Sequence, residues 1–363
     1  TQGLGLHQGE RFAVKFYHTS HRDSRDVRSA GQAGDGAVVP DDALVRRRFQ
    51  RFAAITEPGI GGCAPIVARA VSNKAGSLAY YLYRYVEPKA GMDQQDMIRK
   101  YQNGAGLLAH LHAEGLVHGD PHNENMIFTE AGETWFIDYD TGARQLPRAR
   151  PGRIPDDRVP EALRAVMFDW HQFYPVSFAD FPSIYNDVAL RNEILGIIMD
   201  DLREVFREQI GGMNERDVVA FLDRHLPVNV FEQYAVLQRD LREYAESRYR
   251  LDRQFAHELN NLLLRPLAIT EALIEKFPSL QEQYAPLYQR AKNTRDSLRA
   301  RIPAIRALLM IFEEPQVLAM IDAEQELDIY TPNMVQAVIQ ANSLIMSLIT
   351  AYEQGDLLRS TRT

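Results

Sequence analysis

The hydrophobic and polar positions of the chain follow two different periods. Residues 11–17 (RFAVKFY) alternate well enough to predict a β-strand, and residues 79–88 indicate a second strand that runs into a connector. Elsewhere, apolar residues recur three and four positions apart, which predicts α-helices. The predicted helices cover residues 41–56, 93–114, 162–173, 186–209, 215–225, 231–277, about 281–312 and 331–352. The pattern therefore predicts an α+β protein with a β-rich beginning and a helical remainder.

One stretch interrupts the helical period, at residues 116–140 (LVHGDPHNENMIFTEAGETWFIDYD). It contains two short hydrophobic runs, residues 126–128 and residues 135–137. The turn between them, at residues 129–133, includes Gly132, which suits a tight turn. This arrangement predicts a β-hairpin between helical segments.

Polar side chains surround this predicted hairpin. His118, Asp120 and Asn125 precede its first strand, and Asp138 follows its second strand. Mg²⁺ prefers carboxylate and amide oxygens, and a carboxylate can take or orient the proton of an attacking hydroxyl. The set therefore favours a phosphoryl-transfer site. A metal site formed by His118, Asp120 and His122 is the alternative, but it leaves Asn125 and Asp138 without a role.

Composition narrows the classes of function. The 363 residues carry a net charge of −8, and residues 151–363 hold 23 basic and 32 acidic side chains. This acidic half argues against nucleic acid as a partner. The single cysteine, Cys63, excludes an intrachain disulfide and fits a reducing compartment. No stretch approaches the roughly 18 apolar residues of a membrane span, and the start has no signal pattern, so we expect a cytoplasmic location. Thr1 in place of Met suggests that residues upstream are missing.

The motif HGDxHxxN at residues 118–125, followed by IDYD at residues 137–140, resembles the kinase fold. Gly119 and His122 replace the arginine and lysine of Ser/Thr protein kinases. The motif looks more like that of aminoglycoside and choline phosphotransferases and other atypical bacterial kinases. The resemblance implies a bilobal fold with a small β-rich N-lobe and a helical C-lobe. It also implies transfer of the γ-phosphoryl group of ATP, with Mg²⁺, to a hydroxyl of a small molecule or protein.

The resemblance implies a role for each polar residue around the hairpin. Asp120 would take or orient the proton of the acceptor hydroxyl. His118 would brace the catalytic loop. Asn125 and Asp138 would hold Mg²⁺.

The resemblance also extends to four residues outside this stretch. Lys15 lies in the context A-V-K, where kinases carry the lysine that reaches the α- and β-phosphates. Arg84 and Val86 would lie in the hinge, whose main-chain groups bind adenine. Asp169, next to a tryptophan, would match the buried aspartate that braces the catalytic loop.

The N-terminal part departs from the kinase pattern in two places. Phe52 stands where kinases supply the glutamate that pairs with the lysine, and Glu57 is the nearest acidic residue. The glycine-rich phosphate loop is not evident, because Gly3, Gly5 and Gly9 leave too little chain before Lys15; residues 1–6 are better explained as a strand. The second hypothesis is therefore a pseudokinase or scaffold that binds nucleotide weakly and uses its C-terminal helices for partner binding or dimerisation.

We expect a kinase-like N-lobe, a C-lobe and an added antiparallel helical bundle, with bounds at residues 1–90, 91–227 and 228–363. Pro266 is expected to kink the long helix. In that helix, the sequence FAHELNN around His257 resembles the phosphoacceptor helix of sensor histidine kinases. No glycine-rich ATP-binding domain of that family follows, so His257 is interpreted as a surface or interhelix residue. A homodimer or a protein partner through the bundle remains open.

Overall fold

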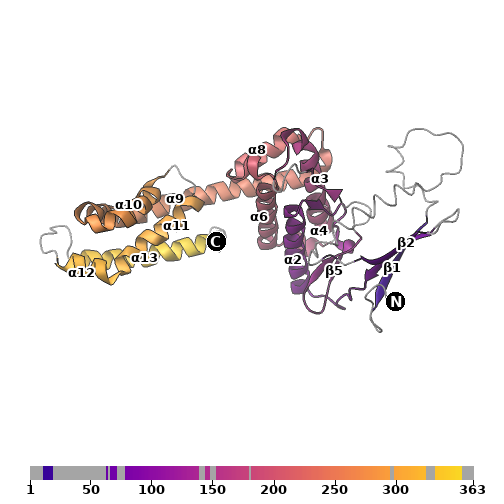
Figure 1. Ribbon diagram of the computed structural model, residues 1–363, viewed down its shortest axis with the longest axis horizontal. Coiled ribbons are helices and arrows are strands. Elements are labelled where there is room, and N and C mark those ends of the chain that lie inside the picture. Colours follow the sequence, from indigo (N-terminus) through magenta and orange to yellow (C-terminus); the bar gives the residue numbers. More distant parts are fainter. Residues whose placement is uncertain are drawn as a thin grey trace. The chain divides into compact units, whose positions relative to one another are not determined.

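The computed structural model describes most of the chain from residue 78 onward and part of what precedes it (Figure 1). The described residues are 11–18, 63, 66–71, 78–138, 144–147, 153–179, 181–294, 298–323 and 332–353. Contacts divide the chain into two compact units, Thr1–Ala245 and Glu246–Thr363. The predicted strand at residues 1–6, the predicted helix at residues 41–56, Phe52 and Glu57 lie outside the described residues.

A three-stranded antiparallel sheet forms the N-terminal part of the first unit. Its strands are β1 (Phe12–His18), β2 (Ile66–Val71) and β3 (Leu78–Arg84), in the order β1-β3-β2. Both strands that alternation predicted are confirmed, and β2 is an additional strand. Lys15 lies opposite Tyr81 in the register of β1 and β3.

The helix α2 (Gln94–Ala113) follows the sheet and confirms the helix predicted at residues 93–114. Asp93 caps its N-terminus: its side chain accepts from the N–H of Asp96, while the Asp96 side chain accepts from the N–H of Asp93. Gly115 has a φ of 82°, a left-handed conformation that ends the helix at low cost.

The predicted hairpin is also confirmed. Strand β5 (Met126–Phe128) pairs with β6 (Thr134–Phe136), and Gly132 in the turn has a φ of 79°. A second short pair, β4 (Leu116–Val117) with β7 (Arg144–Gln145), precedes and follows the hairpin in the chain.

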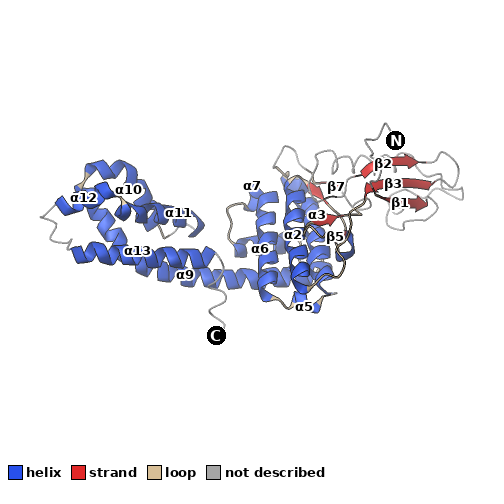
Figure 2. Ribbon diagram, turned by 90° about the horizontal axis from the view of Figure 1, so that it is seen from below, coloured by secondary structure: helices blue, strands red, loops and turns tan. Residues whose placement is uncertain are grey.

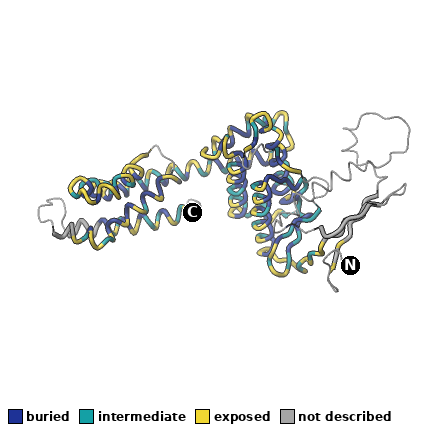
Figure 3. Tube along the Cα trace, viewed as in Figure 1, coloured by how far each residue is buried: buried dark blue, intermediate teal, exposed yellow. Residues whose placement is uncertain are grey.

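Helices supply the rest of the first unit, and α2 and α6 lie side by side in Figures 1 and 2. Their apolar faces share one core, drawn dark blue in Figure 3, whose largest fully buried side chains include Tyr101, Trp170 and Phe173. The helices after the hairpin are α3 (Val159–His171), α4 (Ser177–Ala179), α5 (Pro182–Tyr185), α6 (Val188–Val205), α7 (Arg207–Ile210) and α8 (Glu215–His225).

The long helix α9 (Ala235–Lys276) crosses from the first unit into the second. Leu237, Leu241 and Ala245 in its first turns belong to the core of the first unit. The division by contacts therefore falls inside α9, later than the domain boundary expected before residue 228. The helix is assigned continuously through Pro266, and the kink there stays a prediction.

In the second unit, α9 is joined by α10 (Pro278–Lys292), α11 (Leu298–Leu309), α12 (Pro315–Ala323) and α13 (Pro332–Glu353). The single helix expected at about residues 281–312 is wrong. The chain leaves the helix at Asn293, whose ψ of 93° is extended, and a new helix begins at Leu298. The final helix, predicted to end near residue 352, is confirmed.

These helices share a second hydrophobic core, which contains Phe255, Leu259 and Leu263 of α9. The ring of Phe255 stacks on Tyr352 of α13 at a centroid distance of 4.1 Å, so the first and last helices of this unit pack together. Among the described residues, no helix has the length and apolar character needed to cross a membrane.

Candidate active site

Four hydrogen bonds close a ring around the loop between β4 and β5. The N–H of Asp120 donates to Nδ1 of His118 (3.2 Å), and Nδ2 of Asn125 donates to the carbonyl of Asp120 (2.9 Å). The N–H of Ile137 donates to the carbonyl of Asn125 (2.9 Å), and Nε2 of His118 donates to the carbonyl of Ile137 (3.1 Å). The ring joins the loop to the end of β6, directly before Asp138. The three residues predicted before the hairpin are thus linked to Ile137, which directly precedes Asp138.

His118 is held as a neutral imidazole in this ring. The side chain is 1% exposed, and burial lowers its pKa to about 4, although the nearby Asp169 acts in the opposite direction. Because Nδ1 accepts a backbone N–H, the single ring proton sits on Nε2, where it meets the Ile137 carbonyl. His118 therefore lacks a free nitrogen for proton transfer at neutral pH. Its contacts suit the bracing role expected for it.

Asp169 of α3 binds the main chain of the same loop. Its Oδ2 accepts the N–H of His118 (2.6 Å), and its Oδ1 accepts the N–H of Gly119 (2.8 Å). The N–H groups of His118 and Gly119 both point at this carboxylate because Gly119 has a φ of 90°. Residues other than glycine rarely adopt this conformation. The bracing contact expected for Asp169 is confirmed.

A buried cation lies behind Asp169. His112 of α2 contacts Asp201 Oδ2 through Nδ1 (2.7 Å) and Asp169 Oδ2 through Nε2 (3.2 Å). Burial lowers the pKa of His112, but the carboxylates of Asp201 and Asp169 outweigh it and raise the pKa to about 9. The imidazolium donates to both carboxylates, and Trp170 Nε1 also donates to Asp201 (2.6 Å). This network ties α2, α3 and α6 to the loop.

The carboxylate of Asp120 is the accessible part of the site. Its side chain is 40% exposed, and Oδ2 lies 3.5 Å from Nε2 of His122. Nδ1 of His122 accepts the N–H of Glu124 (3.2 Å), and its Nε2 lies 3.2 Å from the amide nitrogen of Asn125. His122 therefore lies between Asp120 and Asn125, while the exposed carboxylate of Asp120 stays open to an incoming hydroxyl.

Asn125 and Asp138 carry side-chain oxygens of the kind that Mg²⁺ binds. The amide nitrogen of Asn125 is committed to the carbonyl of Asp120, so its oxygen is the atom suited to a cation. Asp138 has a φ of 59°, and such backbone strain in a residue other than glycine concentrates at functional sites. The described part of the chain contains no cluster of three or more histidine, cysteine or acidic side chains that could hold a metal ion. Two protein ligands suffice for Mg²⁺, which usually keeps waters and substrate phosphates.

The structure determines the backbone positions of the other predicted residues. Lys15 lies in the middle of β1, and its side chain is outside the described residues. Arg84 ends β3 and is exposed, and Val86 is half-buried in the connector that follows. The connector approaches the hairpin, because the N–H of Lys89 donates to the carbonyl of Phe128 (2.7 Å).

Three buried residues around the loop are not among those that the sequence predicts: His112, Asp201 and Lys100. All are at most 4% exposed. Lys100 of α2 donates through Nζ to the side-chain oxygen of Asn123 (2.9 Å) and to its carbonyl (3.2 Å). A signal did exist for two of them, because His112 and Lys100 both fall on the apolar face of the helix predicted at residues 93–114.

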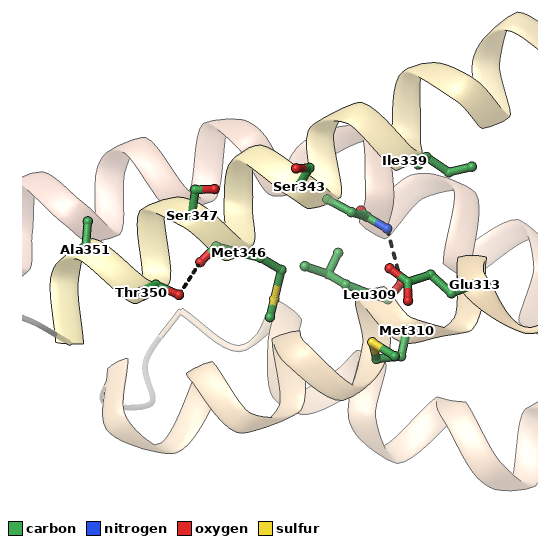
Figure 4. Close-up of a pocket in the computed structure, with 10 residues that line it drawn as sticks. Leu309, Met310, Glu313, Ile339, Ser343, Met346, Ser347, Thr350 and Ala351 are labelled. Carbon is green, nitrogen blue, oxygen red and sulfur yellow. Dashed lines mark hydrogen bonds between the residues drawn. The ribbon is translucent and has the colours of Figure 1, made fainter.

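A separate cavity of about 580 Å³ lies in the second unit. It is bounded by the end of α11, the turn that follows it, and α13, and Figure 4 shows Leu309, Met310 and Met346 among its lining side chains. None of the residues predicted for phosphoryl transfer lines it. It is therefore distinct from the loop between β4 and β5.

Comparisons with known proteins give a short similarity. Three 3-deoxy-D-manno-octulosonic acid kinases, from strains M23, Temecula1 and 9a5c of Xylella fastidiosa, are each 36% identical to the chain over 44 residues. Over that stretch the chain is similar to kinases. The matched stretch covers 12% of this chain and 18% of the length of each relative. No protein-family model matches the chain.

Proposed function

We propose that the chain is a kinase-like phosphotransferase that uses ATP and Mg²⁺ to phosphorylate a hydroxyl group. The observation that carries the proposal is the closed ring of hydrogen bonds through His118, Asp120, Asn125 and Ile137. It holds an accessible carboxylate and an amide oxygen next to the strand end that carries Asp138. The short similarity to kinases supports the same class of reaction.

Each residue of the site has a separate task in this proposal. Asp120 orients the acceptor hydroxyl and accepts its proton, which suits its exposed carboxylate. Asn125 and Asp138 would hold Mg²⁺, which supplies charge neutralisation at the phosphates when it is bound. His118 and Asp169 keep the loop rigid, because positioning and electrostatic stabilisation provide most of the catalysis in phosphoryl transfer.

The lysine and the hinge complete the proposed nucleotide site. Lys15 would reach the α- and β-phosphates from β1, and the main chain at Arg84 and Val86 would bind adenine. We further propose a bilobal kinase-like arrangement, in which the β1-β3-β2 sheet is the small lobe and the helices after residue 91 form the large one. The helices of the second unit would follow as an added bundle.

The acceptor can be a small molecule or a protein. The kinases that match a stretch of this chain are named for a sugar acid, so hydroxylated sugar acids are the first acceptors to test. The accessible Asp120 is compatible with either class of acceptor.

A phosphoryl-transfer screen with labelled ATP tests the proposal. The full chain is incubated with Mg²⁺ and a panel containing 3-deoxy-D-manno-octulosonic acid, other hydroxylated sugars and protein substrates. Asp120→Asn should lower transfer about 100- to 10,000-fold, because a positioned general base contributes that much. Asp157→Asn is the matched control, since this carboxylate is 80% exposed and lies outside the proposed site.

The possible outcomes separate the two hypotheses. Transfer by the wild type that Asp120→Asn abolishes and Asp157→Asn preserves supports the proposal. Full transfer by Asp120→Asn would overturn the role of Asp120. Wild-type protein that binds Mg²⁺ and ATP but phosphorylates no acceptor would favour the pseudokinase or scaffold instead.

A further inference from the structure

Lys100 is a buried cation to which the proposed reaction assigns no role. It lies on the core-facing side of α2 and is 4% exposed. Burial alone lowers its pKa, to about 8. In the part of the chain that the structure describes, Nζ donates to neutral oxygens and forms no ion pair with a carboxylate. Burying an ammonium group without an opposite charge destabilises the fold. An apolar side chain of similar size would be buried here at a lower cost in free energy.

The partners of Lys100 converge on one residue of the loop. Nζ donates to Oδ1 of Asn123 (2.9 Å) and to its carbonyl oxygen (3.2 Å). The hydroxyl of Tyr101, the next residue of α2, lies 3.4 Å from the same Oδ1. Asn123 also accepts the N–H of Met126 at its carbonyl. Both oxygens of Asn123 are thus fixed by donors from the helix and from the turn itself.

Asn123 begins the short 3₁₀ turn Asn123–Asn125, which ends on the proposed Mg²⁺ ligand. A turn this short has little stability of its own, because it contains few hydrogen bonds. A shift of Asn123 would therefore carry Asn125 with it. The Asn125 amide would then lose its bond to the carbonyl of Asp120, and its oxygen would no longer have a fixed direction.

We propose that Lys100 is a positioning residue of the phosphoryl-transfer site, which holds the turn Asn123–Asn125 so that the Asn125 amide oxygen faces Mg²⁺. The inference rests on the proposed function. Lys100 does not touch nucleotide or acceptor in this role. It acts through Asn123.

The test compares three variants of the full chain. Lys100→Met keeps the length of the side chain and removes the donor and charge. The double variant Lys100→Met with Asn123→Leu also removes the acceptor, so no polar group remains buried without a partner, and stability should return towards that of the wild type. Lys292→Met is the matched control, because this lysine pairs with Glu271 in the second unit.

Two quantities are measured for each variant: the midpoint of thermal unfolding and the Mg²⁺ concentration that gives half-maximal stabilisation by ATP. For Lys100→Met and for the double variant, we expect the half-saturating Mg²⁺ concentration to rise about 10- to 100-fold, as for other residues that orient metal ligands. The double variant should recover thermal stability without recovering Mg²⁺ affinity. Lys292→Met should leave the half-saturating concentration unchanged.

A purely structural role predicts a different pattern. If the double variant recovers both stability and Mg²⁺ affinity, or if Lys100→Met leaves the Mg²⁺ dependence unchanged, the positioning role is overturned while the proposed function stands. If the wild type shows no Mg²⁺-dependent stabilisation by ATP, the proposed function fails, and this inference fails with it.

Discussion

Two buried cations of α2 support the same loop in opposite electrostatic settings. His112 lies between the carboxylates of Asp169 and Asp201, and its pKa rises to about 9. The ammonium group of Lys100 donates to the two neutral oxygens of Asn123, and its pKa falls to about 8. Burial by itself acts to lower the pKa of both groups. The opposite net shifts of His112 and Lys100 therefore come from their different partners. The comparison shows that burial by itself does not decide whether a charge stabilises the fold.

The difference also separates two tasks. The His112 network holds α2, α3 and α6 together and fixes the N–H groups of His118 and Gly119 through Asp169. The ammonium group of Lys100 donates to Asn123, in the turn that ends on Asn125. We therefore expect His112 to matter chiefly for stability and Lys100 chiefly for the geometry of the site.

The largest effect is expected from removing His112. His112→Leu leaves the carboxylates of Asp169 and Asp201 buried without their cation, which should lower the free energy of unfolding by about 3–5 kcal/mol. Lys100→Met should lower it by only about 1 kcal/mol, because the lost hydrogen bonds are offset by relief of the buried charge. Urea unfolding of the full chain measures both values. A loss for His112→Leu no larger than that for Lys100→Met would contradict the comparison.

The two cations should also give opposite dependences of stability on pH. The folded pKa of His112 is raised from 6.5 to about 9, so its stabilisation is complete below pH 6.5 and is lost as the pH rises through about 9. The loss is roughly 3 kcal/mol. The folded pKa of Lys100 is lowered from 10.5 to about 8, so its cost is present below pH 8 and is relieved as the pH rises towards 10.5.

Unfolding free energies measured between pH 6 and pH 10 check this prediction. Subtracting the curve of His112→Leu from that of the wild type should leave a difference that falls with pH. The same subtraction for Lys100→Met should leave a difference that rises above pH 8. Two differences of the same sign would mean that one of the two assignments is wrong.

A smaller effect is expected at the glycine that lets the loop meet Asp169. Gly119→Ala places a side chain at a φ of 90°, which should cost about 1–3 kcal/mol. The same change at Gly132, with a φ of 79° and open space around it, is the matched control. Both variants should melt earlier, but only Gly119→Ala should lower phosphoryl transfer. Equal transfer by the two variants would show that the direction of the Gly119 N–H is unimportant.

Local chemistry made a large part of the first unit predictable. The hairpin at residues 126–136 followed from two hydrophobic runs and a glycine turn, and α2 followed from its spacing and from Asp93 as cap. The loop polar residues were found because they lie close together in the chain. The hydrogen bond between His112 and Asp201 joins residues 89 positions apart, and periodicity cannot choose such a partner.

The second unit was predicted less well. Helical spacing continued from residue 281 to residue 312, although the chain leaves the helix at Asn293. Spacing identifies which residues are apolar on one face, but a change of direction depends on the backbone at one or two positions. Strand β2 was missed for a related reason, since residues 66–71 gain their partner only from β3, which follows them in the chain.

The smallest effect is expected at the cap of the helix that carries both cations. Asp93→Ala removes the acceptor for the N–H of Asp96 and should lower the free energy of unfolding by about 1 kcal/mol. Capping acts on the first turn of α2, whereas Lys100 and His112 lie in later turns. We therefore expect the pH dependence of stability and the half-saturating Mg²⁺ concentration to match those of the wild type. A change in either would mean that the cations depend on where α2 begins as well as on their own partners.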